Sequence, residues 1–151
     1  MSTGTSLIAF KQALQTALTA RPALAGVQVA YEFPTTNITG EDIWLDRAES
    51  DSTYPVMRAG TKKVDEDYTV IVMIQVLKTQ GEGQEAADLR AAALLAELQQ
   101  CIAENPQLIP QIQWASFAGW QHLLGPFESG GAARGSRFEV RVKVRARLFP
   151  E

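Results

Sequence analysis

The segment formed by residues 138–149 alternates apolar and charged side chains without a break until its end. Because successive side chains of a β-strand point to opposite faces, this pattern predicts a long strand with one apolar and one charged face. The charged face carries Glu139, Arg141, Lys143, Arg145 and Arg147. Such a strand is typical of an antiparallel sheet covered on one face only. Other elements of the chain must therefore cover the apolar face.

The remaining periodicities predict two helices and four further strands. Apolar residues at three- and four-residue spacing predict helices over residues 7–20, with Ser6 as the cap, and over residues 84–103. The predicted strands are residues 27–32, 42–46, 68–77, 112–120 and 138–148. We expect an α+β fold: an antiparallel or mixed sheet of about five strands, with both helices packed on one face and the first two strands forming an antiparallel pair.

Length and charge limit the classes of protein. A chain of 151 residues is the size of one domain, so we expect a single domain over residues 1–151. The net charge of −3 argues against a general nucleic-acid binder, although a local basic face remains open. Cys101 is the only cysteine, so it cannot form an intramolecular disulfide, and we expect it in the core. Residues 1–6 are not a basic region followed by an apolar run, and no stretch approaches the roughly 20 apolar residues of a membrane span, so we expect a soluble protein without an export signal.

Two segments lack the apolar residues needed to pack by themselves. We expect a long charged loop at about residues 47–67 and a glycine-rich arm at about residues 125–136, both mobile in an isolated subunit. The strand between residues 68 and 77 is apolar on both faces, whereas the helices cover one. A second copy of the chain is the simplest cover for the other face. Leu89 lies opposite Leu98 on its helix, so we expect Leu89 to be exposed.

Few side chains are suited to catalysis or metal binding. His122 is the only histidine, and one histidine with one cysteine excludes a Cys/His metal site. The acidic runs at residues 46–51 and 65–67 send neighbouring carboxylates to opposite faces of an extended chain, so we expect solvated charges. We therefore expect no enzyme activity, no cofactor and no metal, with a small enzyme of unrecognised site as one alternative.

The basic strand face allows a nucleic-acid-binding reading. Sheets that bind single-stranded RNA stack bases on aromatic side chains of the same face. Phe138 and Phe149 do not interleave with the four basic residues of this face, Arg141, Lys143, Arg145 and Arg147. We therefore favour a subunit contact or a solvated face, and keep a small nucleic-acid-binding α+β module as an alternative.

The layout of the whole chain resembles the tail terminator (tail completion) proteins of long-tailed bacteriophages. The resemblance is carried by the order of the elements and by three stretches: Arg58-Ala59-Gly60-Thr61-Lys62-Lys63 with residues 65–70, residues 91–106, and residues 137–145. It implies a small structural virion protein without an active site. Another phage neck or head–tail connector protein could share this layout.

The resemblance also implies a mode of action and a set of partners. Such proteins form a ring, expected to be hexameric, that caps the tail tube, stops its polymerisation and joins tail to head. The expected partners are other copies, the tail tube protein and the neck or connector protein, with DNA passing through the ring without sequence-specific binding. The expected location is the head-proximal end of the virion tail, after assembly in the bacterial cytoplasm. The residues we expect at subunit or partner contacts are Arg58, Lys62, Lys63, Leu89, Arg141, Lys143, Arg145 and Arg147.

Overall fold

Five strands and two α-helices make up most of the computed structural model, which describes residues 4–34, 40–50, 64–78, 83–124 and 134–148. Their order along the chain is α1 (Leu7–Thr19), a 3-10 helix η1 (Pro22–Leu24), β1 (Gln28–Ala30), β2 (Glu41–Ser50), β3 (Val64–Lys78), α2 (Gln84–Glu104), β4 (Ile112–Leu124) and β5 (Arg134–Leu148). The predicted α+β class is confirmed.

The strands form one mixed sheet in the order β1-β2-β3-β5-β4. Neighbouring strands are antiparallel except for β1 and β2, which pair in parallel from Gln28 opposite Asp42 to Ala30 opposite Trp44. The expected antiparallel pair of the first two strands is therefore wrong. Because β1 has only three residues, the chain needs to return only about 10 Å before β2 begins, and residues 31–40 are long enough to do so.

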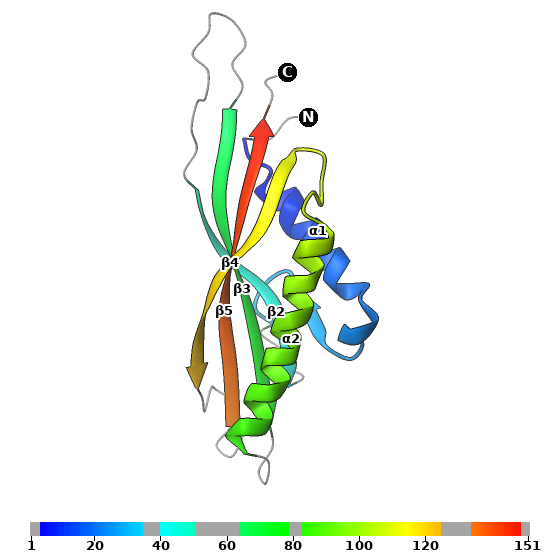
Figure 1. The fold of residues 1–151 in the computed structure, drawn as a ribbon, viewed down its shortest axis with the longest axis vertical. Coiled ribbons are helices and arrows are strands. Elements are labelled where there is room, and N and C mark those ends of the chain that lie inside the picture. Colours follow the sequence, from blue (N-terminus) through cyan, green and yellow to red (C-terminus); the bar gives the residue numbers. More distant parts are fainter. Residues whose placement is uncertain (1–3, 35–39, 51–63, 79–82, 125–133, 149–151) are drawn as a thin grey trace, which may run out of the picture.

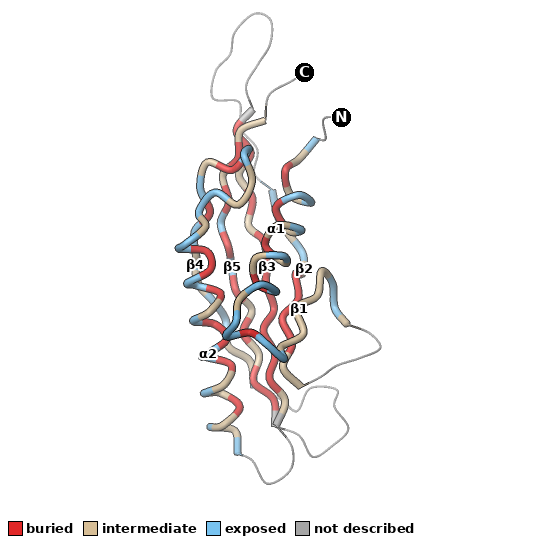
Figure 2. The backbone as a smooth tube through the Cα atoms, turned by 90° about the vertical axis from the view of Figure 1, so that its right-hand side faces the viewer, coloured by how far each residue is buried: buried red, intermediate tan, exposed pale blue. Residues whose placement is uncertain are grey.

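Both helices lie on the same side of the sheet, as predicted (Figure 1). The side chains of β3 and β5 that face the helices include Val72 and Val142, which are fully buried. Leu98 of α2 packs into the same core and is also fully buried. The core therefore lies between the helix pair and one face of the sheet. Figure 2 shows the buried residues along the strands and on the helices. The predicted register of the last strand is confirmed by Val142 inside and Arg141 outside.

A buried polar cluster ties the start of α1 to β3. The backbone N–H of Ser6 and its hydroxyl both donate to Oε1 of Glu66, each over 2.9 Å. The Ser6 hydroxyl also lies 2.9 Å from the hydroxyl of Tyr68. Burial raises the pKa of Tyr68 to about 12, although the Ser6 hydrogen bond opposes it. We expected the Ser6 side chain to cap α1, but it makes no capping hydrogen bond, because its hydroxyl is bonded to Glu66 and Tyr68 of β3.

Arginines join the helices to each other and to the sheet. Arg21, between α1 and η1, pairs with Glu97 over 3.0 Å and with Glu104 over 2.9 Å on α2. Arg90 of α2 binds both carboxylate oxygens of Glu41 at the start of β2. Since all these side chains lie at the rim of the core, the pairs fix how the helices lie across the sheet without being buried in it.

The central strand β3 is buried on both faces, as predicted. On the face away from the helices, Ile71 and Met73 form a small cluster with Trp44 of β2, and all three are at most 7% exposed. Phe33 packs edge-on against Trp44 at 5.0 Å, and the guanidinium of Arg137 lies 5.7 Å from the same ring. The protomer thus covers this apolar patch with its own side chains, so the patch does not itself require a second copy.

The two irregular segments are shorter than expected. Strand β2 continues to Ser50, β3 begins at Val64 and β5 begins at Arg134, so pairing with neighbouring strands overrides the polar composition there. The rest of the predicted loop and arm, residues 51–63 and 125–133, lies outside the described residues. Their mobility stays a prediction.

Candidate interaction surface

The face of the sheet that carries no helix is here called the open face. Cross-strand register places alternate residues of β3, from Asp65 to Gln75, on it beside alternate residues of β5, from Arg137 to Arg147. Trp44 and Arg47 of β2 and Trp114 of β4 lie on the same face. This surface contains the four basic residues of the last strand that the sequence singled out.

Two of those basic residues are held in bidentate ion pairs. Arg145 binds Asp67 through hydrogen bonds of 2.7 and 3.1 Å, and Arg147 binds Asp65 through hydrogen bonds of 2.6 and 3.0 Å. Each pair joins residues directly opposite on β3 and β5. Arg47 of β2 forms a further ion pair with Glu139 of β5 through one hydrogen bond, and this pair spans the intervening strand β3. We call these three pairs the ion-pair ladder.

The ion-pair ladder corrects the expected solvation of the acidic run. Asp65 and Glu66 are only 6% and 3% exposed, and Asp67 is partly buried. Their side chains do diverge as predicted, since Glu66 points to the helix side while Asp65 and Asp67 lie on the open face. Asp65 and Asp67 are paired because β5 places Arg147 and Arg145 directly opposite them. Opposite charges in facing positions stabilise a strand pair.

The lowered pKa of Asp65 predicts how the stability of the protein depends on pH. The hydrogen bond from Arg147 lowers the pKa of this carboxyl against the opposing effect of burial. A lowered folded pKa adds stability above the unfolded value of about 3.9, and this stability is lost as the pH falls through the folded pKa. We expect the difference in free energy of unfolding between the wild type and Asp65→Asn to shrink below about pH 4. Urea unfolding at a series of pH values from about 7 to 2 measures this difference. A difference that stays constant would contradict this linkage, and Glu32→Gln on the surface serves as control.

Arg141 and Lys143 differ from their neighbours on β5. Both side chains are exposed, and they stand opposite Ile71 and Thr69, which carry no charge. Within the described part of the chain, neither has a carboxylate partner at ion-pair distance. Of the four predicted contact residues of β5, Arg145 and Arg147 therefore pair with acids of β3, whereas Arg141 and Lys143 are exposed without such a pair. Their role in contacts with a partner stays a prediction.

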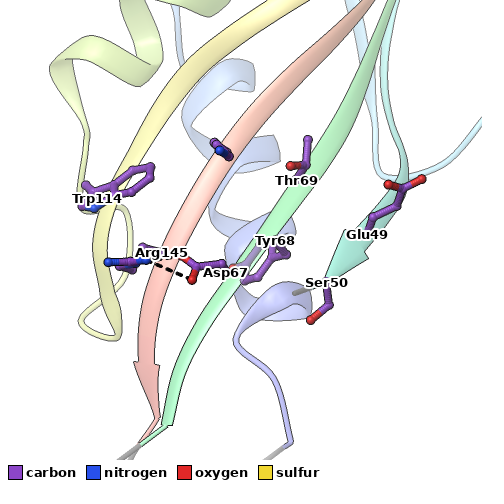
Figure 3. Close-up of a pocket in the computed structure, with 8 residues that line it drawn as sticks. Glu49, Ser50, Asp67, Tyr68, Thr69, Trp114 and Arg145 are labelled. Carbon is purple, nitrogen blue, oxygen red and sulfur yellow. Dashed lines mark hydrogen bonds and ion pairs between the residues drawn. The ribbon is translucent and has the colours of Figure 1, made fainter. Parts of the chain in front are cut away.

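A hollow of about 390 Å³ lies on the open face beside Lys143. Figure 3 shows Trp114 on one side, Glu49 and Ser50 on the other, and the Arg145–Asp67 pair between them. Trp114 is 38% exposed, and its ring lies 6.0 Å from the guanidinium of Arg145. The expectation that aromatics do not interleave with the basic residues holds within β5 but not across the sheet, because β4 brings Trp114 into register with Arg145.

The other predicted contact residues lie elsewhere. Leu89 is 66% exposed, as expected, but it belongs to α2 on the opposite side of the sheet from the open face. Arg58, Lys62 and Lys63 fall outside the described residues. The sequence analysis did not identify Asp65, Asp67, Trp114 and Arg47 as residues of this surface. A signal for the first two was present: two acids stand two residues apart at 65 and 67, and two arginines have the same spacing at 145 and 147.

His122 does have polar neighbours, but not in a catalytic arrangement. Its Nε2 lies 2.8 Å from Oγ of Ser136 and 3.3 Å from Oδ1 of Asp88. In a Ser-His-Asp triad the serine and the carboxylate bind opposite ring nitrogens, whereas here one nitrogen faces both. Ser136 is also fully buried. These contacts join α2 to β4 and β5.

The described residues contain one cysteine, Cys101, and its thiol is free. Cys101 is 1% exposed, and burial raises the pKa of its thiol, which agrees with the expected core position. Within these ranges no cluster of three or more His, Cys, Asp or Glu is placed to hold a metal ion. Over the same ranges, the helices are too short or too polar to cross a membrane.

Comparison with known proteins gives a likeness of fold. No protein-family model matches the chain, and no curated protein matches its sequence. Among solved structures, a chain described as "Virion of native gene transfer agent (GTA) particle" superposes with a TM-score of 0.54 at 16% sequence identity. The match covers 90% of this chain and 94% of the other, so the likeness extends over nearly the whole of both. The chain is thus similar in fold to a chain of a virion particle.

Proposed function

We propose that this chain is a structural protein of a phage-like virion and that it acts as a tail terminator. In this role several copies, expected to be six, form a ring at the head-proximal end of the tail. The ring caps the tail tube, stops its polymerisation and presents the surface for joining the head. The observation that carries the proposal is the fold likeness to a virion chain over 90% of the sequence. The proposed role needs no enzyme chemistry or cofactor.

Native mass spectrometry and electron microscopy of purified tail tubes test the proposal. We expect a discrete ring that binds one end of the tube and limits tail length in an assembly reaction. A protein that binds head connectors but leaves tube ends bare would instead favour another neck protein. A monomer that leaves tubes unbound would overturn the proposal.

The open face supplies the contact residues of this proposal. Arg141 and Lys143 are exposed cations on an acidic protein, and complementary charge fixes the register and the choice of partner. We expect Arg141→Glu with Lys143→Glu to weaken ring or tube binding about tenfold or more, while the melting temperature stays unchanged. Unchanged assembly would remove these residues from the contact.

Arg145→Glu is the contrasting variant. It places a second carboxylate directly opposite Asp67, and like charges in opposite positions destabilise a strand pair. We therefore expect Arg145→Glu to lower the melting temperature of the protomer itself. Comparing the two variants separates a loss of assembly from a loss of folding.

A second candidate function rests on Trp114. An exposed indole beside Arg145, with Lys143 lining the same hollow, is the combination that stacks and neutralises single-stranded nucleic acid. Fluorescence titration with single-stranded RNA and DNA tests this candidate. Salt-dependent binding that is lost in Trp114→Ala would support it, and no binding at low salt would exclude it.

A further inference from the structure

Strand β4 forms one edge of the sheet. It pairs with β5 on one side, and none of the strands that the structure describes pairs with it on the other. At its start the carbonyl of Gln113 accepts a hydrogen bond from the side chain of Gln107. Beyond that point, the outward backbone groups offer a template for another strand.

The composition of β4 does not protect this edge. Its 13 residues include no Asp, Glu, Lys or Arg, although natural proteins commonly use charges, especially lysine, to block pairing at sheet edges. The opposite edge of the sheet is different. Strand β1 is only three residues long, and the side chain of Gln15 donates to the carbonyl of Val29 over 3.4 Å. One edge is therefore short and partly covered, and the other is long and neutral.

The regular part of β4 is residues 119–124. Register shifts interrupt the pairing with β5 between Ile112 and Trp114 and between Phe117 and Gly119. Gly119 has φ of 123°, which only glycine adopts readily, so this bulge is built into the sequence. From Gly119 to Leu124 the pairing is continuous. Trp120 and Leu124 are 51% and 61% exposed in this stretch, so the open edge also carries apolar side chains.

We propose that residues 119–124 of β4 pair through backbone hydrogen bonds with a second copy of this chain, so that the sheet of one protomer adjoins the next. The inference rests on the proposed assembly of several copies. The charge of the chain favours a second copy as the partner of this edge. Two copies both carry a net charge of −3, and an edge without Asp, Glu, Lys or Arg lets them meet without like-charge repulsion. A different protein selected by charge would instead need charges on this edge. The exposed Trp120 and Leu124 add apolar area to the contact.

Lysines introduced on this edge test the contact. Ala118→Lys with Gln121→Lys changes two exposed positions, one in the bulge just before the proposed contact and one within it. The protomer is expected to tolerate both changes, because Ala118 is exposed and Gln121 stands opposite Glu139. We expect the melting temperature of the protomer to be kept and its apparent dissociation constant to rise at least about tenfold, as measured by light scattering over a dilution series. The matched control is Gln99→Lys with Ala103→Lys on the exposed side of α2, which should assemble like the wild type.

Hydrogen exchange provides a readout that does not depend on a variant. Along an edge strand, alternate amides point outward and find no partner within the sheet. We expect those amides in residues 119–124 to exchange fast in diluted monomer and slowly in the assembled protein. Amides that already donate to β5 should be slow in both.

The outcomes separate this inference from the proposed function. If the edge variant forms a ring of the same mass as the wild type, and the outward amides exchange fast in that ring, the edge contact is overturned while the proposed ring stands. A wild-type dimer that the edge variant splits supports the edge contact and removes the ring. A wild-type protein that is monomeric at every concentration overturns both.

Discussion

Leu98→Ala is expected to lower the free energy of unfolding by about 2 to 5 kcal/mol, the range for truncating a leucine in a packed core. Leu98 is fully buried where α2 faces the sheet, so the surrounding side chains of β3 and β5 leave a cavity when its isobutyl group is removed. Urea unfolding followed by circular dichroism measures the loss. The m-value should stay constant, because the folded state keeps its extent of buried surface.

Leu89→Ala provides the matched control, since it is the same change on the same helix at a side chain that is 66% exposed. We expect a change within about 0.5 kcal/mol, as at other surface positions. A loss below that size for Leu98→Ala would mean that α2 presents a different face to the sheet. Equal losses at both positions would also contradict the packing described.

Glu66→Ala is expected to cost about 2 to 4 kcal/mol, because each buried donor left without an acceptor costs about 1 to 3 kcal/mol. The carboxylate accepts from both the N–H and the hydroxyl of Ser6, in a site that is 3% to 4% exposed. Its removal leaves those donors without that acceptor beside Tyr68. Hydrogen exchange of the first turns of α1 should speed up more than that of α2, since the lost contacts anchor α1 alone.

Glu32→Ala is the control for this variant, because Glu32 is exposed. It should change stability by no more than about 0.5 kcal/mol. Glu66→Gln keeps an acceptor oxygen and should restore part of the lost stability. Slow exchange in α1 of Glu66→Ala would show that other contacts anchor this helix.

The amphipathic elements could be predicted because their local pattern and their packing agree. The alternation in β5 assigned the correct face to Val142 and Arg141, and the spacing in α2 placed Leu98 inside and Leu89 outside. For these residues one face is apolar along the whole element, so a shift by one position would bury charge. The α+β class follows from the same patterns.

The missed features depend on contacts between distant segments. Nothing local in Asp65 or Asp67 shows that arginines about eighty residues later will stand opposite them. The parallel direction of β1 likewise depends on a return of the chain that strand patterns do not encode. Trp114 joined the basic face only because a register shift in β4 sets it beside Arg145. Pairing partners are a property of the sheet, whereas periodicity is a property of the segment.

The position of β5 between β3 and β4 has a consequence for the order of events during synthesis. β5 is the last described strand to leave the ribosome, yet it joins the middle of the sheet to the β4 edge. Until it is made, β3 lacks one neighbour and β4 has no place in the sheet. The sheet is therefore completed only after residues 134–148 have been translated, as expected where sequence-distant pairings dominate. A chain that has not yet made β5 thus has no completed β4 edge, and in the proposed assembly a copy is added only after β5 has paired with β3 and β4.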